Sequence, residues 1–531
     1  MSSQMESREG VAALPARLAE RLGAEHVLTG DEERRYFSTD LSFQPGELAD
    51  CVIRPGSTEE LSDAVRLCAE AGVPVVPRGG GMSYTRGYVP EQGRSVLVDM
   101  RRMNRILEIN ADDMYVTVEC GCTWKQLYEA LQEQGVRTPY YGPLSGMYAT
   151  VGGALSQNSL FLGSGLYNTA AESCLGLQVV MADGRLVQTG SGAQKHSNGF
   201  YRHFGPDLTG LFTADTGAFG FKAVATLRLI PSPRATEYLS FGFESLDAML
   251  KAQTDIARLR IASECYGFDP YYNSSFEDMG FTLGEGMKML GKIATSGGVK
   301  GLVNSLKVAV SGRKVLSKVN YSLHMTFDGI DAAAARSGQR AAFELCEAAG
   351  GREIDHSIPV AFRAEPFNGV RTILLGAKGE IWLPVHGFFP LSRARQAAEA
   401  TEQFIRDNQA LMERHGIKTS YLTAFSGSEF VIEPSFYWFD RLGDFRLDLI
   451  EPEFRAKWKD IPEDLDTRQV VLRLRAELRD LFDQHGACHL QIGKYYPFRD
   501  VMASNETWEL LQGVKRLVDP EGRMNPGSLG L

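Results

Sequence analysis

The feature that most constrains the fold is a glycine-rich, charge-poor run from residue 141 to residue 230. It contains Gly-Pro-Leu-Ser-Gly at 142–146, Ala-Thr-Val-Gly-Gly-Ala at 149–154 and Thr-Gly-Ala-Phe-Gly at 216–220, and it ends in an apolar, strand-like segment at 223–230. Glycine has no Cβ, so such turns let the backbone approach a ligand closely and present N–H groups to anionic oxygens. The run predicts a large, phosphate-bearing cofactor.

Composition narrows the class of protein. A chain of 531 residues is too long for one hydrophobic core, so we expect at least two domains. The formal net charge of -10 argues against a protein that binds polyanions, because phosphate backbones are held by accumulated Lys and Arg. We therefore expect no nucleic acid partner.

The cysteines and the N-terminus indicate the compartment. Eight cysteines are scattered along the chain, and Cys120 and Cys122 are the one close pair. One intervening residue is an unusual metal spacing, so we expect free thiols, a reducing compartment and no structural zinc. Residues 1–10 are polar and acidic, which fits neither a signal peptide nor a membrane span. The simplest expectation is a cytoplasmic protein, with peripheral attachment to a membrane left open.

The N-terminal part has the pattern of an α/β unit. A strand is expected over 51–55, and Ser57 caps the helix that follows it. A second strand over 73–77 runs into the turn Arg-Gly-Gly-Gly-Met-Ser at 78–83. Further strands are expected at 95–100, 105–109 and 115–119, and helices at 14–22, 31–36 and 123–134.

Prolines at 231 and 233 mark a domain boundary. Beyond them we expect a helix over 392–415, capped by Ser392, and strands near 381–385 and 436–439.

The glycine turn at 78–83 excludes two common phosphate-binding motifs. It lacks the Gly-Lys-Ser/Thr ending of a Walker loop, and it lacks the Gly-x-Gly-x-x-Gly spacing of a nicotinamide dinucleotide fingerprint. On its own a tight turn would also explain three glycines.

The combination of motifs resembles the flavoproteins of the vanillyl-alcohol oxidase and p-cresol methylhydroxylase type. The matching stretches are residues 77–83, 98–100, 149–153, 179–190, 217–220, 493–495 and 519–527. The resemblance implies an α+β fold in which two subdomains bind FAD and an α+β cap domain covers the substrate. The boundaries it implies are an N-terminal helical segment (1–44), an FAD-binding domain (45–235), a substrate or cap domain (236–470) and a C-terminal segment that completes the flavin site (471–531).

The resemblance also implies which residues contact FAD. The turn would supply N–H donors to the pyrophosphate, which offset the loss of water around its charges. The residues are Pro77, Arg78, Gly79, Gly80, Gly81, Met82, Ser83, Pro143, Thr150, Gly152, Gly153, Gly220 and Asn525.

A covalent flavin link is not expected. Some relatives carry His after the glycine turn, and this chain has Met82 at that position. The cap position that bears His or Tyr in other relatives falls near residues 430–433, which hold no suitable nucleophile. We predict non-covalent FAD, although His415 and Tyr421 lie near the second position.

Four residues are candidates for the chemistry, in which flavin accepts a hydride and the protein handles the substrate proton. Tyr495 matches a tyrosine that binds the substrate oxygen in phenol-oxidising relatives, but Tyr496 stands where they have Arg, so Lys494 becomes the candidate cation. His386 follows an apolar strand and is a candidate base. The alternatives are aromatic packing for the two tyrosines and a structural role for His386. No metal site is expected.

The favoured function is an FAD-dependent oxidoreductase that takes a hydride from an alcohol or activated C–H of an aromatic or lipophilic small molecule. The alternative is a 2-hydroxy-acid dehydrogenase of the glycolate or D-lactate type, for which Arg363 and Arg371 are candidate carboxylate ligands. A redox-neutral flavoprotein similar to the alkyl-ether lipid synthases is the alternative from another class.

The segment from Gly280 to Asn320 is basic and apolar within an acidic chain. It suits an anionic membrane surface or an acidic protein electron acceptor, and the alternative is a solvated pair of helices. A homodimer is also left open.

Overall fold

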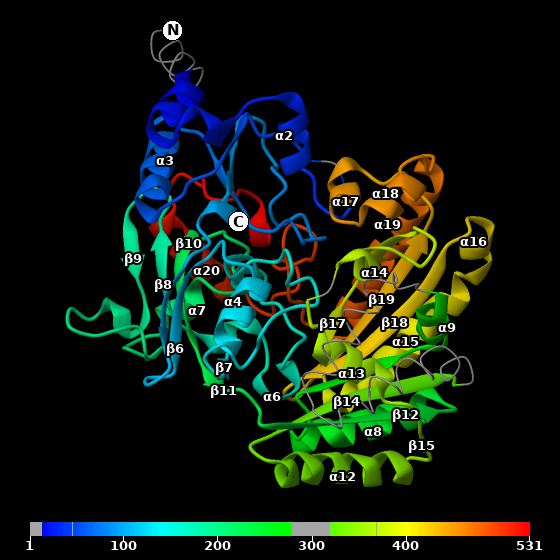
Figure 1. The fold of residues 1–531 in the computed structure, drawn as a ribbon. Coiled ribbons are helices and arrows are strands. Elements are labelled where there is room, and N and C mark those ends of the chain that lie inside the picture. The colour runs from blue at the N-terminus through cyan, green and yellow to red at the C-terminus, as the bar shows by residue number, and fades with distance from the viewer. Residues whose placement is uncertain (1–12, 45, 279–318, 368) are drawn as a thin grey trace. The chain divides into compact units, whose positions relative to one another are not determined.

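The computed structural model describes residues 13–44, 46–278, 319–367 and 369–531 (Figure 1). Within these, the chain forms two compact units. The first draws on residues up to 159, 169–231 and 490–531, and the second on 160–168 and 232–489. The boundary expected after residue 470 falls inside one helix of the second unit, α19 (Leu465–Gln484).

The first unit contains two main sheets. The four-stranded sheet has the order β1-β2-β4-β3, with β2, β4 and β3 parallel and β1 antiparallel to β2. The five-stranded sheet has the order β5-β6-β10-β8-β9 and is antiparallel. The strands are β1 (Val27–Leu28), β2 (Cys51–Ile53), β3 (Val75–Arg78), β4 (Val96–Asp99), β5 (Ile106–Asn110), β6 (Tyr115–Glu119), β8 (Cys174–Val180), β9 (Leu186–Gln188) and β10 (Phe221–Arg228).

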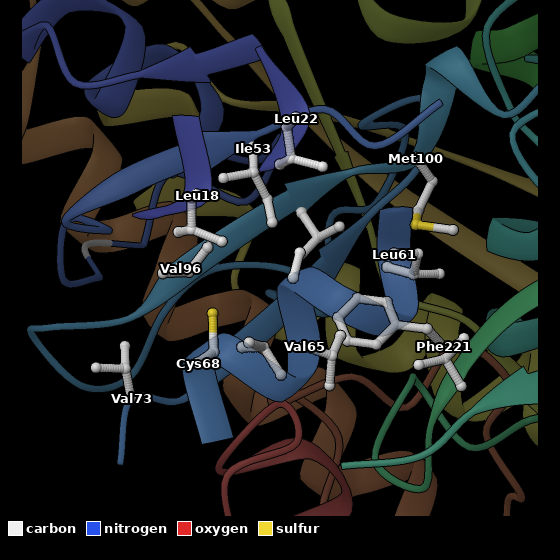
Figure 2. Close-up of a cluster of buried hydrophobic side chains, with 14 of the residues drawn as sticks. Leu18, Leu22, Ile53, Leu61, Val65, Cys68, Val73, Val96, Met100 and Phe221 are labelled. Carbon is white, nitrogen blue, oxygen red and sulfur yellow. The ribbon is translucent and has the colours of Figure 1, made fainter. Parts of the chain in front are cut away.

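Helix α3 (Thr58–Glu70) joins the two sheets through one core. Ser57 caps it as predicted, because its side chain accepts a hydrogen bond from the N–H of Glu60. Figure 2 shows Leu61 and Val65 of this helix in the same apolar cluster as Phe221 from β10. Burying a Leu or Val side chain contributes about 1.5–3 kcal/mol, so this cluster stabilises the first unit as one body.

The remaining elements of the first unit connect or cover its sheets. They are helices α2 (Asp31–Phe37), α4 (Trp124–Gln132), α5 (Val151–Gln157), α7 (Leu208–Leu211) and α20 (Asn505–Val518), and the strand pair β7 (Val136–Arg137) and β11 (Ile230–Pro231).

The second unit is built on an antiparallel sheet of eight strands. Seven follow the order β15-β12-β14-β13-β18-β19-β16, and β17 pairs with β19. Its strands are β12 (Ala235–Phe243), β13 (Glu264–Phe268), β14 (Tyr321–Gly329), β15 (Arg352–Glu353), β16 (Ile381–Pro384), β17 (Gly387–Pro390), β18 (Lys418–Ser426) and β19 (Glu429–Trp438).

Helices pack on both faces of this sheet. Helix α12 (Ala332–Ala348) lies on the face of Phe241, whose ring meets Phe343 at 5.3 Å, and α8 (Leu246–Leu259) lies on the same face (Figure 1). Helix α13 (Ser357–Ala364) covers the opposite face. The other helices are α6 (Ser164–Tyr167), α9 (Pro270–Asp278), α14 (Arg371–Leu374), α15 (Ala394–Asp407), α16 (Gln409–Arg414), α17 (Asp444–Asp448) and α18 (Pro452–Trp458).

The prediction of one helix over 392–415 is wrong in two respects. Ser392 does not cap it, because this residue lies in a 3-10 turn, and the helix begins at Ala394 without a side-chain cap. Asn408 then separates α15 from α16.

The basic segment from Gly280 to Asn320 lies almost wholly outside the described residues. Among those described, no helix is long and apolar enough to span a membrane.

Candidate functional site

The glycine turn at 79–83 lies directly against residues 148–150. A Cβ on Gly79 would overlap Oγ1 of Thr150, and a Cβ on Gly80 would overlap the carbonyl oxygen of Tyr148. Gly80 therefore excludes any side chain, because the backbone atoms that it faces cannot move aside, whereas a side chain at Gly79 would displace the side chain of Thr150. Two segments that are about seventy residues apart in sequence meet at this point.

Arg78 and Tyr88 hold the turn in place. Pro77 and Arg78 are the last residues of β3, and the buried guanidinium of Arg78 lies over the rings of Phe37 and Tyr88 at 4.8 and 5.1 Å. The Tyr88 hydroxyl donates to the carbonyl of Gly81 at 2.9 Å. Gly81 has φ +79°, a conformation that favours glycine.

Three more of the predicted residues lie in turns of the first unit. Ser83 Oγ accepts a hydrogen bond from the N–H of Thr85 at 3.2 Å. The carbonyl of Pro143 accepts one from Gly146 at 2.9 Å. Met82 is half-buried, and its thioether carries no proton that it could lose on forming a covalent bond to flavin.

Helix α5 begins at the point where the two segments meet. Thr150 caps it, with Oγ1 accepting from the N–H of Gly153 at 3.3 Å. The N–H of Gly152 donates to the carbonyl of Cys120 at 2.8 Å, and a Cβ on Gly152 would lie 2.7 Å from the Cβ of Cys120. Gly152 therefore serves close backbone packing, and Thr150 shapes the turn.

Asn525 ties three parts of the first unit together. Its Nδ2 donates to the carbonyls of Gly87 at 2.8 Å and Thr216 at 2.7 Å, and its backbone N–H donates to Val75 at 2.8 Å. Its buried Oδ1 has no hydrogen-bond partner among the described residues. A buried acceptor without a partner costs about 1–3 kcal/mol, and a bound polar ligand would remove that cost.

A buried ion pair beside this region was not anticipated from the sequence. Lys222 Nζ lies 2.7 Å from Asp215 Oδ1, and Asp215 also accepts the N–H of Gly217 at 3.0 Å. The available signal was an acid and a lysine seven residues apart in an otherwise apolar run. Gly220 packs against β8, since its Cβ would lie 2.5 Å from Cγ1 of Val179.

Lys494 is fixed to the segment that follows the glycine turn. Its backbone N–H donates to Thr85 at 2.9 Å and its Nζ donates to the carbonyl of Val89 at 2.6 Å. Burial lowers the pKa of Lys494 to about 7, and the nearby carboxylate of Glu91 partly opposes that shift. The ammonium of Lys494 is therefore not a permanent charge at neutral pH.

Tyr495 and Tyr496 are both buried in the first unit. Their rings meet edge to face, with centroids 5.1 Å apart, and their backbone N–H groups share the carbonyl of Ile492. This geometry fits both aromatic packing and substrate contact.

His386 lies in the second unit, between β16 and β17, and is buried. Its ring centroid is 6.0 Å from that of His489, and its carbonyl lies 2.8 Å from His489 Nδ1. His489 Nε2 in turn lies 2.7 Å from Asp483 Oδ1. Both contacts are hydrogen bonds when His489 carries a proton on each nitrogen.

One row of side chains crosses the sheet of the second unit on the face that α13 covers. Strand register places Tyr266 between His324 and Ala424, Ala424 beside Val431, and Val431 beside Phe388. Alternation along each strand puts all five on the same face. The sequence alone did not reveal this row, because it depends on pairing between distant strands.

Tyr266 is the centre of an aromatic cluster. Its ring lies 5.6 Å from Phe161, 5.4 Å from Phe268 and 5.5 Å from Phe362. Burial raises the pKa of Tyr266, and its hydroxyl has no hydrogen-bond partner among the described residues. Burial also lowers the pKa of His324 to about 3, so both polar groups of the row are neutral at physiological pH.

The two candidate carboxylate ligands are already paired with acids. Arg363 bonds to Asp328 and lies 3.7 Å from Glu264, and Arg371 Nε lies 3.1 Å from Glu451. Neither guanidinium offers a surplus positive charge to a substrate, so this part of the 2-hydroxy-acid hypothesis loses its support.

Metal ligands do not gather in the described part of the chain. No group of three or more His, Cys, Asp or Glu side chains there could hold an ion, and all eight cysteines are free thiols.

Comparisons with known proteins agree with this architecture. Residues 49–190 match the family described as FAD binding domain, and residues 496–529 match FAD linked oxidases, C-terminal domain. The glycolate oxidase subunit GlcD of Bacillus subtilis is 32% identical over 239 residues, which cover 45% of this chain and 49% of that protein. The mitochondrial D-lactate dehydrogenase (cytochrome) of Arabidopsis thaliana is 34% identical over 214 residues, covering 40% and 36%. The chain thus matches about half or less of each of these relatives.

The fold extends further than the sequence similarity. The structure of p-cresol methylhydroxylase with substrate bound superposes with a TM-score of 0.73 at 17% identity, covering 98% of this chain and 97% of that one. The 4-ethylphenol oxidase of Gulosibacter chungangensis gives a TM-score of 0.67 at 18% identity, with the same coverage. The predicted α+β fold with a cap domain is confirmed.

Fold and matches together define a flavoprotein. Residues 49–190 match an FAD binding domain, residues 496–529 match the C-terminal domain of FAD linked oxidases, and the chain has the fold of p-cresol methylhydroxylase. The residues present fit FAD, since Gly80, which admits no Cβ, and the unpaired buried acceptor of Asn525 lie in the same unit. The predicted cofactor is thus confirmed at the level of FAD.

Proposed function

We propose that this protein oxidises a 2-hydroxy acid at its hydroxyl-bearing carbon, using FAD bound without a covalent link, and that the substrate carries a bulky apolar side chain. The oxidation of a 2-hydroxy acid rests on one observation: relatives about one-third identical to this chain are named for glycolate and D-lactate. These two compounds share a carboxylate and an adjacent hydroxyl.

The apolar side chain is inferred from the row on the sheet of the second unit. The neutral aromatic cluster around Tyr266, Phe268 and Phe362 suits an aryl or branched alkyl group better than the hydrogen or methyl of glycolate or lactate. Ala424 is the smallest member of the row and lies beside Tyr266. The free hydroxyl of Tyr266 would donate to a substrate oxygen.

FAD supplies the hydride acceptor when it is bound. His386 is the proposed base: as the C–H bond breaks, it accepts the proton of the substrate hydroxyl. His489 contacts both Asp483 and the carbonyl of His386, so it would hold this segment in position.

The proposal is tested by measuring flavin reduction without oxygen, monitored as the loss of the visible absorbance of the flavin. The panel contains both enantiomers of 3-phenyllactate and lactate, with glycolate and 4-ethylphenol. We expect 3-phenyllactate to exceed lactate by about tenfold or more in kcat/KM, because one hydrophobic group contributes about 1–3 kcal/mol. Preference for glycolate or lactate would refute the apolar side chain, and failure of every 2-hydroxy acid would refute the proposed reaction.

Variants separate the two roles. His386→Asn is expected to slow flavin reduction by about 10²–10⁴-fold while FAD is retained, and His415→Asn, in which the changed histidine faces Thr467, serves as the control. Ala424→Phe adds a ring beside Tyr266 and should lower activity on 3-phenyllactate more than on lactate. Ala424→Val is the milder variant if the ring prevents folding.

Oxidation of an alkylphenol is the second candidate. The buried pair Tyr495 and Tyr496, next to Lys494 with its pKa of about 7, favours it. Rapid reduction by 4-ethylphenol that is lost in Tyr495→Phe would replace the first proposal with this one. A flavin that no compound of the panel reduces would favour the redox-neutral class.

The basic segment from Gly280 to Asn320 keeps the proposal made from sequence, that it contacts an anionic membrane surface or an acidic electron acceptor. Liposome co-sedimentation tests the membrane option. Equal binding of wild type and of variants with its lysines changed to Glu would remove it.

A further inference from the structure

Helix α20 presents two of the most exposed large apolar side chains in the described part of the chain. Leu510 is 72% exposed and Leu517 is 78% exposed. They are seven residues apart, so both lie on the same side of the helix, two turns from each other. Gly513 lies between them, and a Cβ there would meet nothing within 4 Å.

The opposite side of α20 is firmly attached to the first unit. Trp508 and Lys515 are buried. Lys515 Nζ donates to the carbonyls of Ala218 at 2.7 Å and Met524 at 2.9 Å, and pairs with Asp519 at 2.7 Å. These contacts fix the rotation of the helix, so the exposure of the two leucines follows from the fold.

Charged residues flank the leucines with the same spacing. Glu509 and Arg516 are both exposed, are seven residues apart and share one flank of the helix. Neither has an ion pair among the described residues. The flank therefore carries an acid toward its N-terminal end and a base toward its C-terminal end.

This pattern is self-complementary in one orientation. If a second α20 lies antiparallel, a two-fold axis near Gly513 places Leu510 against Leu517 of the other copy and Glu509 against Arg516 of the other copy, each contact occurring twice. A parallel pair would instead oppose Glu509 to Glu509, which is unfavourable. Gly513 has no side chain, so it lets the helices approach closely at the axis.

We propose that two copies of this chain associate through an antiparallel, two-fold contact between their α20 helices. One helix pair is smaller than a typical permanent interface, so we expect a weak association that depends on protein concentration. The contact is independent of the reaction proposed above.

Sedimentation velocity of the FAD-loaded full chain, from about 1 to about 100 μM, tests the proposal. We expect a shift from monomer to dimer over this range, and monomer throughout for the double variant Leu510→Glu, Leu517→Glu. Leu465→Glu, an exposed leucine of α19, is the matched control and should leave dimerisation unchanged. Retained FAD and an unchanged melting temperature verify that each variant is folded.

A charge exchange gives the sharper test. Glu509→Arg alone and Arg516→Glu alone each place like charges in contact and should weaken the dimer by about tenfold or more, whereas the double exchange should restore it. A monomeric wild type, a dimer that survives the leucine double variant, or a double exchange as weak as the single variants would each overturn the proposal.

Discussion

Gly80→Ala probes the contact between the glycine turn and the segment at 148–150. In the structure a Cβ at residue 80 would overlap the carbonyl oxygen of Tyr148, and its next neighbours are also backbone atoms. The turn and the segment must therefore separate by roughly 1.5 Å before normal van der Waals contact returns. Overpacking of this kind costs about 1–3 kcal/mol in the absence of ligand.

The larger effect is expected on FAD, because both moved segments belong to its proposed binding site. A positional error of about 1 Å in a pre-organised site can cost about 100-fold. At an FAD concentration 100 times the wild-type dissociation constant, binding stabilises the folded state by about 2.7 kcal/mol. With a 100-fold weaker affinity, the same concentration would stabilise it by about 0.4 kcal/mol.

Urea unfolding with and without FAD separates these two effects, and flavin fluorescence gives the affinity directly. Gly93→Ala is the control, since Gly93 is exposed and a Cβ there would meet one atom within 4 Å, Oε2 of Glu47 at 3.7 Å. If Gly80→Ala binds FAD with wild-type affinity, the glycine turn and the segment at 148–150 do not bind the cofactor together.

Three further predictions concern buried polar groups of the first unit. Lys222→Met should destabilise the fold by about 3–5 kcal/mol in urea, because it leaves Asp215 buried and unpaired, and adding Asp215→Asn should recover part of that loss. Between about pH 7 and pH 10.5 the folded chain has released the Lys494 proton that the unfolded chain still holds, so the free energy of unfolding should rise with pH by at most about 1.4 kcal/mol per pH unit. Lys494→Met should lack this rise. Urea unfolding at about pH 7 and about pH 9 measures it, and an equal change in the wild type and the variant would contradict the prediction. Asn525→Ala should cost about 2–4 kcal/mol and reduce FAD retention on gel filtration, because two buried carbonyls lose their donor.

The sequence predicted those parts of the structure whose cause is local. Ser57 caps α3 because a serine before an apolar, helix-periodic segment satisfies the first N–H groups wherever the helix packs. The glycine turn at 78–83 could be recognised because three glycines directly after an apolar strand form a local pattern. Ser392 shows the limit of such reasoning, since the same type of residue lies here in a 3-10 turn that begins right after Pro390.

Groups that depend on pairing between distant segments were not predictable in this way. Asn525 reaches Gly87 and Thr216 across more than three hundred residues of sequence. No local pattern records such contacts.

The same difference explains why the cofactor is better defined than the substrate. The glycines at 79–81 and 152–153 form clusters that can be recognised in the sequence itself, before the contacts that they make are known. The row of Tyr266, Ala424 and Val431 exists because three strands pair in one register, and a shift of one residue in β13 would turn Tyr266 to the face of α8 and α12 and bring Cys265 or Gly267 into its place. Substrate preference in this protein should therefore respond to changes in the pairing of β13 with β14 and β18, even where no residue of the row is altered, while FAD affinity should not.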